Sequence, residues 1–315
     1  MQGKTEIDRI GIKAYSLKVL KEEGLFKEKL LILEALPSRE EFFQLLKKQG
    51  FKDGQKIFVR FSHPKKSVFL PKKLLEDFDS IYNFASGNYS SGLAVIVHDY
   101  IQGKYGGTIS RYGDELIMEF VESGWNSDYA VNIDTAIFTE TESTWYLYKG
   151  ERKVPVYEEG KGVTVKTVTQ LDDETVQKLF LEIKGKLGKV RKLLTENLNS
   201  LEFLISEELK FKPIELQYID FEEKKLTQMG NENVFELKTP YDLRRWDGKT
   251  KLLISIPAAE DRADKLMQVI HKIKDKVDTV FIGYGVLSHP AILLREAGIR
   301  VERKLSNYRV LKLKY

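Results

Sequence analysis

His289 is the residue of this chain whose type and neighbours are best suited to chemistry. It follows an apolar strand pattern and a glycine turn, and it opens a short helical segment with Pro290 in the first turn and Gly298 past the end. Ser288 or His289 itself could cap this helix. A helix N-terminus favours an anion, and an imidazole is largely neutral near pH 7, so the pattern indicates a histidine that could accept a phosphoryl group. The alternative is a histidine that caps the helix or is merely exposed.

The segment from Lys251 onward predicts the unit that must position His289. Its strands, helices and closing strand are expected at Lys251–Pro257, Asp261–Lys274, Asp278–Gly283, Pro290–Ala297 and Tyr308–Tyr315. Alternation of strand and helix is typical of a small parallel α/β sheet. Such sheets bind ligands at the carboxyl ends of their strands, which is where His289 falls. We place the boundary of this unit in the stretch 240–248.

Upstream of that stretch, the sequence predicts a domain that mixes helices and strands. Helical periodicity runs from Ser16 to Gly50, with one helix beginning near Pro37–Ser38, and a long helical stretch covers Asp172–Leu204. Strand patterns are expected at Lys56–Ser62, at Gly92–Ile101, in an antiparallel β-rich region up to about Val168, and on both sides of an acidic turn at Glu222–Lys224. The predicted fold class is therefore α+β or α/β, in two domains.

The composition limits the classes of function. The chain has 315 residues, enough for about two domains, and its 51 cationic and 47 anionic residues leave a net charge of +4. Lys and Glu interleave, so nucleic-acid binding is permitted but not indicated. The absence of cysteine excludes disulfides, thiolate zinc sites and cysteine nucleophiles, and only four histidines argue against a histidine-rich metal centre. No apolar run reaches the ~20 residues that span a bilayer, and the N-terminus lacks a signal-peptide core, so we expect a soluble cytoplasmic protein without a membrane partner.

The segment GYGVLSHPAILLREAGI resembles the phosphohistidine motif of the phosphoenolpyruvate-utilising enzymes, the family of pyruvate phosphate dikinase and phosphoenolpyruvate synthase. That motif is written roughly GGxTSHAAIxARExGI. The positions that match it are Gly285, Ser288, His289, Ala291, Ile292, Arg295, Glu296, Gly298 and Ile299. The positions that depart from it are Tyr284, Leu287, Pro290 and Leu294. By this resemblance His289 would carry the phosphoryl group, and Ser288 could hydrogen-bond the ring or the phosphate.

The resemblance covers most of the chain, although it is weaker towards the N-terminus. It implies an ATP-grasp-like nucleotide-binding domain at 1–238, followed by a swivelling phosphohistidine-type α/β domain at 239–315. Nothing in the chain resembles the family's C-terminal TIM barrel for phosphoenolpyruvate. We therefore expect a shortened relative of the family.

The nucleotide site implied by the resemblance rests on three short segments. GIKAYSL resembles the family's GGKGANL start and FVRFS its VRSS strand, so Lys13 and Arg60 would hold the triphosphate oxygens of ATP. AVIVHDYI resembles the strand that lies against adenine, which implies contacts from Ile96 and His98. From residue types alone, Lys13 and Arg60 could equally be ordinary surface charges, and His98 is better interpreted as a buried or hinge residue than as a ligand.

The metal site implied by the resemblance lies in PIELQYIDFEEKKLTQM, which looks like the family's pair of metal-binding strands. Glu215 stands at the family's Asp, Gln217 at its metal-binding Glu, and Gln228 near its LQ glutamine. A neutral amide is a poorer ligand than a carboxylate for magnesium, a hard dication. Glu215 shares a strand face with Gln217 and could compensate, and Asp220 or Glu222 could contribute. The alternative is that metal binding has been weakened or lost.

Two hypotheses of function follow. The first is a kinase-type phosphotransferase that uses ATP and magnesium and passes a phosphoryl group through His289 to an unknown acceptor, either a molecule or a partner protein. The second is a catalytically degenerate relative that acts as a nucleotide-binding regulatory subunit or as a subunit of a complex. A basic nucleic-acid-binding protein ranks below both, because it needs a contiguous cationic stripe.

Overall fold

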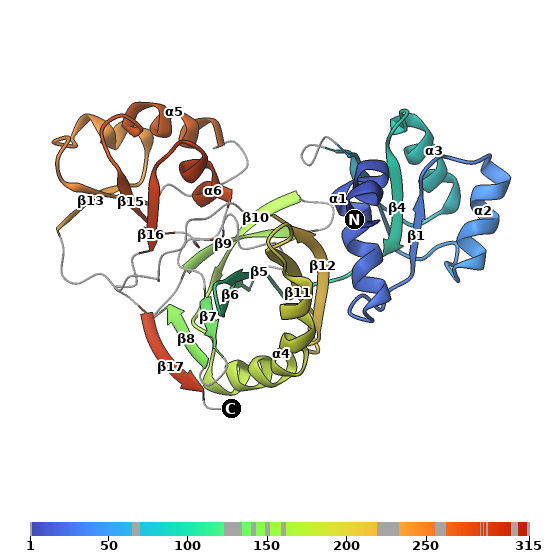
Figure 1. Ribbon diagram of the computed structural model, residues 1–315, viewed down its shortest axis with the longest axis horizontal. Coiled ribbons are helices and arrows are strands. Elements are labelled where there is room, and N and C mark those ends of the chain that lie inside the picture. Colours follow the sequence, from blue (N-terminus) through green and yellow to red (C-terminus); the bar gives the residue numbers. More distant parts are fainter. Residues whose placement is uncertain are drawn as a thin grey trace. The chain divides into compact units, whose positions relative to one another are not determined.

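The computed structural model describes residues 2–64, 70–122, 134–139, 143–148, 152–158, 162–218, 233–255, 263–283, 285, 287, 289–303 and 308–313. The chain divides into two compact units, Met1–Gln102 with Lys212–Gln217 and Gly103–Phe211 with Tyr218–Tyr315. Both units contain helices and strands (Figure 1), so the mixed α/β class predicted from the sequence is confirmed. No helix in these described ranges is long and apolar enough to cross a bilayer.

The first unit is built on a four-stranded antiparallel sheet in the order β1-β4-β2-β3. Its elements are α1 (Gln2–Glu22), β1 (Leu30–Leu33), α2 (Arg39–Lys48), β2 (Ile57–Ser62), β3 (Lys72–Leu75), α3 (Phe78–Asn88) and β4 (Ala94–Asp99). Successive side chains of a strand point to opposite faces of the sheet. Val59 and Val97 therefore face the apolar core formed with α2 and α3. Arg60, Ile96 and His98 occupy the opposite face, and α1 contacts the same two strands, β2 and β4.

A large antiparallel sheet has the strand order β12-β11-β5-β6-β7-β8-β17; six of its strands belong to the second unit, and residues 212–217 of β12 belong to the first. Its strands are β5 (Tyr105–Tyr112), β6 (Glu115–Val121), β7 (Asp134–Phe138), β8 (Ser143–Tyr148), β11 (Ser200–Ile205), β12 (Phe211–Gln217) and β17 (Tyr308–Leu313). A separate hairpin pairs β9 (Arg152–Glu158) with β10 (Gly162–Val168). Helix α4 (Asp173–Leu193) begins at Asp172, whose carboxylate accepts a hydrogen bond from the Thr175 N–H at 2.8 Å, and it buries one apolar face.

A four-stranded parallel sheet in the order β13-β14-β15-β16 carries the segment around His289. Its elements are β13 (Val234–Leu237), the 3₁₀-helix η2 (Pro240–Arg244), β14 (Lys251–Ile254), α5 (Ala263–Ile273), β15 (Thr279–Ile282), α6 (His289–Glu296) and β16 (Arg300–Arg303). The helices bury Val269, Ile270 and Leu294 against Ile254 and Ile282 of the strands. The small parallel α/β unit expected from the sequence is thus present.

Two predictions about this parallel sheet were wrong. Tyr308–Tyr315 does not close it, because β17 pairs antiparallel with β8, and β16 is the strand beside β15. The sheet also begins earlier than the predicted boundary at residue 239, since β13 pairs with β14 through Val234–Leu237. An edge strand of one sheet offers the same unpaired backbone groups as an edge of another, so sequence pattern alone does not choose between them.

Two helical predictions were too long. Leu30–Leu33 is the edge strand β1 and not part of a helix, because its backbone pairs with β4 from Leu30↔His98 to Leu33↔Val95. The stretch Asp172–Leu204 is a helix only to Leu193, and β11 then pairs with β5. Short apolar runs fit both patterns, and here the tertiary pairing decides. The helix expected to begin near Ser38 is confirmed as α2, with the Ser38 side chain accepting from the Glu41 N–H.

Candidate functional site

Three residues singled out in the sequence meet in the first unit. The Lys13 ammonium donates to both carboxylate oxygens of Glu215, with Nζ 2.9 Å from Oε1 and 3.2 Å from Oε2. The Arg60 guanidinium donates to the same carboxylate, with Nη1 3.1 Å from Oε2. We call Lys13, Arg60 and Glu215 the charge cluster. It brings together α1, β2 and β12, which are far apart along the chain.

The charge cluster is largely removed from water. The exposed fraction of the side chain is 7% for Glu215, 13% for Arg60 and 24% for Lys13. Burial opposes ionisation of Glu215, but the charges and hydrogen bonds of Arg60 and Lys13 outweigh it and hold the pKa of this carboxyl below its ordinary value. Two cations against one carboxylate leave the cluster with a surplus of positive charge. It is therefore a place where an anion could be held.

Arg60 has donor capacity beyond the charge cluster. Its Nη2 lies 3.4 Å from the Ile214 carbonyl oxygen, which is a weak contact. Its Nε is buried, and no acceptor for it exists among the residues that the structure describes. A buried donor without an acceptor is costly, and a ligand oxygen would relieve that cost. This donor fits the prediction that Arg60 binds phosphate.

A break in α1 positions Lys13. Gly11 has φ +78° and ψ 163°, a conformation open almost only to glycine. A Cβ at Gly11 would lie 2.4 Å from Ser62 Oγ and 2.7 Å from the backbone of His63. Just after the break, the Ala14 N–H donates to Ser62 Oγ at 3.2 Å. The backbone of α1 therefore packs closely against the end of β2, the strand that contains Arg60.

Ile96 and His98 lie on the same sheet face as Arg60. In the register of β2 and β4, Arg60 is opposite Ile96 and Phe58 is opposite His98. The His98 ring packs against Phe26 and Phe58, with centroids at 5.8 and 5.4 Å. Burial and then the charge of Arg60 lower the pKa of His98 to about 3, so the ring is neutral near pH 7. The interpretation of His98 as a buried residue is confirmed, whereas the adenine contact stays a prediction.

The implied magnesium ligands do not form a site among the described residues. Glu215 already accepts hydrogen bonds from two cations, and Gln217, half-buried at the end of β12, offers only an amide. Gln228, Asp220 and Glu222 lie outside the described residues. Within the described ranges no three His, Asp or Glu side chains come close enough to hold a metal ion. Of the five implied ligands the structure describes only Glu215 and Gln217, so magnesium binding by this segment stays a prediction.

His289 is the first residue of α6, which follows β15 as the sequence predicted. Ser288 lies outside the described residues, as does the placement of the His289 side chain. Leu287 is buried in the same turn. The structure thus confirms the strand–turn–helix that positions the histidine backbone, and the role of the imidazole stays a prediction.

Glu119 on β6 was not singled out as a site residue in the sequence, yet it contacts this turn. Its side chain is fully buried, and its Oε2 accepts a hydrogen bond from the Leu287 N–H at 3.0 Å. The hydrogen bond joins the large antiparallel sheet to the backbone two residues before His289. The signal in the sequence was the position of Glu119 inside the apolar stretch LIMEFV, where a buried acidic residue needs a specific partner.

No family model matches the sequence, and no curated protein matches it. Solved structures with some likeness include the D-alanine–D-alanine ligases of Bacillus anthracis and Coxiella burnetii. The first has a TM-score of 0.37 at 15% identity over 66% of this chain and 57% of that chain. The second has a TM-score of 0.38 at 10% identity, over 68% of this chain and 48% of that chain.

An ATP-grasp ligase, PsnB, solved with a variant of its minimal precursor, Mg and ADP, gives a TM-score of 0.32 at 12% identity over 68% of this chain and 51% of that chain. The chain thus spans about half the length of the structures it matches. TM-scores below 0.5 carry no conclusion about fold or activity. The case for function therefore rests on the residues of this chain.

Proposed function

We propose that this protein is an ATP-dependent phosphotransferase with an ATP-grasp-like nucleotide domain, in which Lys13 and Arg60 hold the triphosphate and His289 accepts the γ-phosphoryl group. The observation that carries the proposal is the charge cluster. A cluster with surplus positive charge, and a buried Arg60 Nε to which the described residues offer no acceptor, suit an anion with several oxygens. Arg recognises phosphate oxygens with its planar fork and Lys as a point charge.

Glu215 has a defined part in this proposal. In the absence of nucleotide it neutralises part of the charge on Lys13 and Arg60, which prevents two buried cations from repelling each other. Phosphate oxygens would then share these donors with the carboxylate. Glu215 thereby acts as a counter-ion in the proposal, and not as the metal ligand that the resemblance implied.

The proposed transfer is a substitution at phosphorus. One unprotonated ring nitrogen of the His289 imidazole would attack the γ-phosphorus, a P–N bond would form, and the P–O bond to the β-phosphate would break, so that ADP leaves. Such transfer depends on positioning and on neutralising charge on the moving group, which the two cations would supply. The phosphoryl group would then pass from the histidine to an acceptor.

A nucleotide-binding subunit without transfer is the second candidate. One observation favours it: Glu215 is already paired with both cations, which leaves it poorly placed to bind magnesium. In this case ATP binds at the charge cluster and the imidazole stays unmodified. The two candidates differ in a single measurable product, the phosphohistidine.

The test is labelling of the full chain by ATP that carries a labelled γ-phosphate, together with the intact mass. We expect one phosphoryl group, labile in acid and stable in base, that disappears in His289→Ala. The matched control is His271→Ala, which alters an exposed histidine on α5 and should keep the label. ATP binding without label would support the second candidate. Label that persists in His289→Ala would contradict the proposed acceptor.

A further inference from the structure

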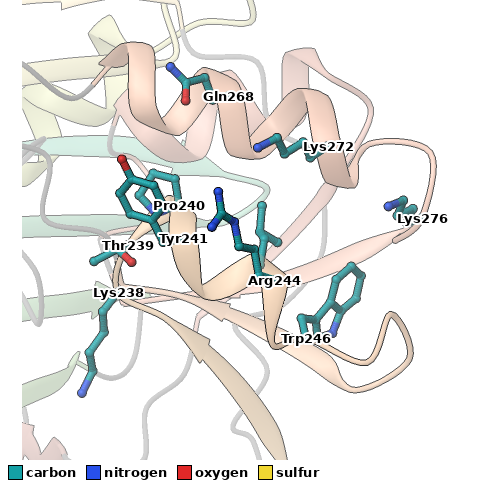
Figure 2. Close-up of a pocket in the computed structure, with 10 residues that line it drawn as sticks. Lys238, Thr239, Pro240, Tyr241, Arg244, Trp246, Gln268, Lys272 and Lys276 are labelled. Carbon is teal, nitrogen blue, oxygen red and sulfur yellow. The ribbon is translucent and has the colours of Figure 1, made fainter.

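A pocket of about 490 Å³ lies in the second unit, between η2 and α5. Tyr241 and Arg244 rise from η2 toward α5, and Gln268 and Lys272 lie on α5 (Figure 2). The residues proposed above for phosphoryl transfer do not line this pocket. Pockets of ~300–1,000 Å³ hold small ligands. This pocket is therefore large enough for one.

The lining of the pocket is cationic and contains no carboxylate. Lys238, Arg244, Lys272 and Lys276 all contribute to it. Lys238 pairs with Glu236 at 3.3 Å, whereas the other three cations form no ion pair with any residue that the structure describes. Three cations without such a counter-ion in one pocket raise the local affinity for an anion. The charge of the pocket thus points to an anionic ligand.

Two aromatic rings add a planar contact surface to the pocket. Tyr241 is 73% exposed, which is unusual for a large ring, and the Arg244 guanidinium lies 5.7 Å from its centroid. The Trp246 Nε1–H donates to the Thr250 carbonyl oxygen at 2.7 Å, so its polar atom is already satisfied. Exposed ring faces stack on planar groups, and a neighbouring arginine strengthens such stacking.

The backbone around these rings is held in place by two aspartates. Asp242 accepts from the backbone N–H groups of Lys238 and Thr239, at 3.1 and 2.8 Å, and so holds the start of η2. Asp247 accepts from the Thr250 N–H at 2.7 Å in the turn after Trp246. The pocket is consequently built on short turns of defined geometry, which lowers the entropy lost on binding.

From this combination we infer that the pocket binds a small ligand of the mononucleotide class, with its phosphate against Arg244 and Lys272 and its planar ring against Tyr241 or Trp246. The cationic lining favours a phosphate group, the two aromatic rings favour a planar base, and the pocket volume limits the size of the ligand. A nucleic acid would instead need a cationic stripe that follows many phosphates. The inference does not depend on the proposed function, since it uses other residues.

Calorimetric titration of the full chain with AMP tests this inference, and adenosine and inorganic phosphate serve as separate probes. AMP should bind more tightly than either part alone. The double variant Arg244→Ala with Lys272→Ala should weaken AMP binding about tenfold or more, the loss expected when charged hydrogen bonds disappear. The matched control Lys274→Ala removes an exposed lysine beyond the end of α5 that does not line the pocket, and it should leave AMP affinity unchanged.

Several results would overturn the inference. These are absence of AMP binding, AMP affinity that the double variant does not change, and phosphate that binds as tightly as AMP. A single-stranded oligonucleotide that binds through Arg244 and Lys272 more tightly than AMP would also overturn it, in favour of nucleic acid. A shift of the Trp246 indole resonance on addition of AMP, measured by NMR, would support the ring contact independently of any variant.

Discussion

At the scale of single residues, the charge cluster changes how three side chains are understood. From their types alone, Lys13 and Arg60 could have been ordinary surface cations, and the family resemblance implied that Glu215 is a metal ligand. The structure pairs them across 202 and 155 residues of sequence, inside one unit. Removing one member of a buried ion cluster leaves the others uncompensated, which is costly. Each of the three residues should therefore affect stability as well as binding.

The counter-ion role of Glu215 predicts a specific dependence on pH. Because its pKa in the folded protein lies below the ordinary 4.5, Glu215 contributes stability above pH 4.5 and loses it as the pH falls through the folded pKa. Glu215→Gln should lower the free energy of unfolding at neutral pH by about 3 kcal/mol. It should also reduce the loss of stability on acidification, measured by urea unfolding at several pH values.

The control for this experiment is Glu174→Gln, which alters an exposed i,i+4 pair with Lys178 on α4. Such a pair contributes little, so the stability and its dependence on pH should remain those of the unmodified protein. Equal acid sensitivity in Glu215→Gln and the unmodified chain would show that Glu215 is not the ionised centre of the cluster.

The residue types of the cluster could be predicted from the sequence, but their meeting could not. The family resemblance named Lys13, Arg60 and Glu215 through separate short segments. Their contact depends on the break at Gly11 and on the placement of β12, and no local pattern encodes either. Glu119 was missed for the same reason, because its partner is a backbone N–H at Leu287, 168 residues later.

Among the helices and strands, the packing of α1 against the end of β2 determines where Lys13 lies. Gly11→Ala would place a methyl group 2.4 Å from Ser62 Oγ in a backbone conformation that disfavours side chains. We expect a loss of about 2–3 kcal/mol in the free energy of unfolding, measured by urea titration. ATP binding should weaken in the same variant, because the Lys13 backbone must shift.

Gly24→Ala is the matched control for this prediction. Gly24 also has a positive φ, of +69°, but a Cβ there would meet nothing within 4 Å. Its loss of stability should be about 1 kcal/mol, from backbone strain alone, with ATP binding unchanged. If the two variants proved equally stable, the steric argument at Ser62 would be wrong.

The observed helices and strands show which sequence patterns predicted secondary structure correctly. The helices α2 and α4 were predicted from their helical apolar period, and the structure adds N-caps at Ser38 and Asp172. The strand β1 was missed because its four apolar residues also fit a helix. The partner of β17 was wrong because two sheets offer edges, and only tertiary packing selects β8. Local sequence patterns thus predicted whether a segment is a helix or a strand better than they predicted which strands pair.

At the scale of the whole molecule, the chain is organised differently from a simple division at residue 238. The first compact unit consists of two separate segments, residues 1–102 and residues 212–217. More than a hundred residues of the chain lie between them. Glu215 belongs to this returning segment, so the charge cluster is complete within one unit. The boundary that we placed at 240–248 carried no sign of this returning strand.

The proposed function assigns nucleotide binding to the first unit and the phosphoryl acceptor to the second. Its central claim is that the charge cluster holds the triphosphate. Lys13 is the best residue for testing this claim. It is the most exposed member of the cluster, and Arg60 still pairs with Glu215 when the ammonium is removed. Lys18, on the same helix, pairs with Glu6 instead and provides the control.

The deciding measurement is calorimetric titration of ATP into the unmodified chain, Lys13→Ala and Lys18→Ala, each first shown to be folded by its thermal transition. We expect ATP to bind the unmodified chain and Lys18→Ala equally, and to bind Lys13→Ala about tenfold more weakly or worse. Equal ATP affinity in all three proteins, or no ATP binding to the unmodified chain, would show that the charge cluster does not hold the triphosphate.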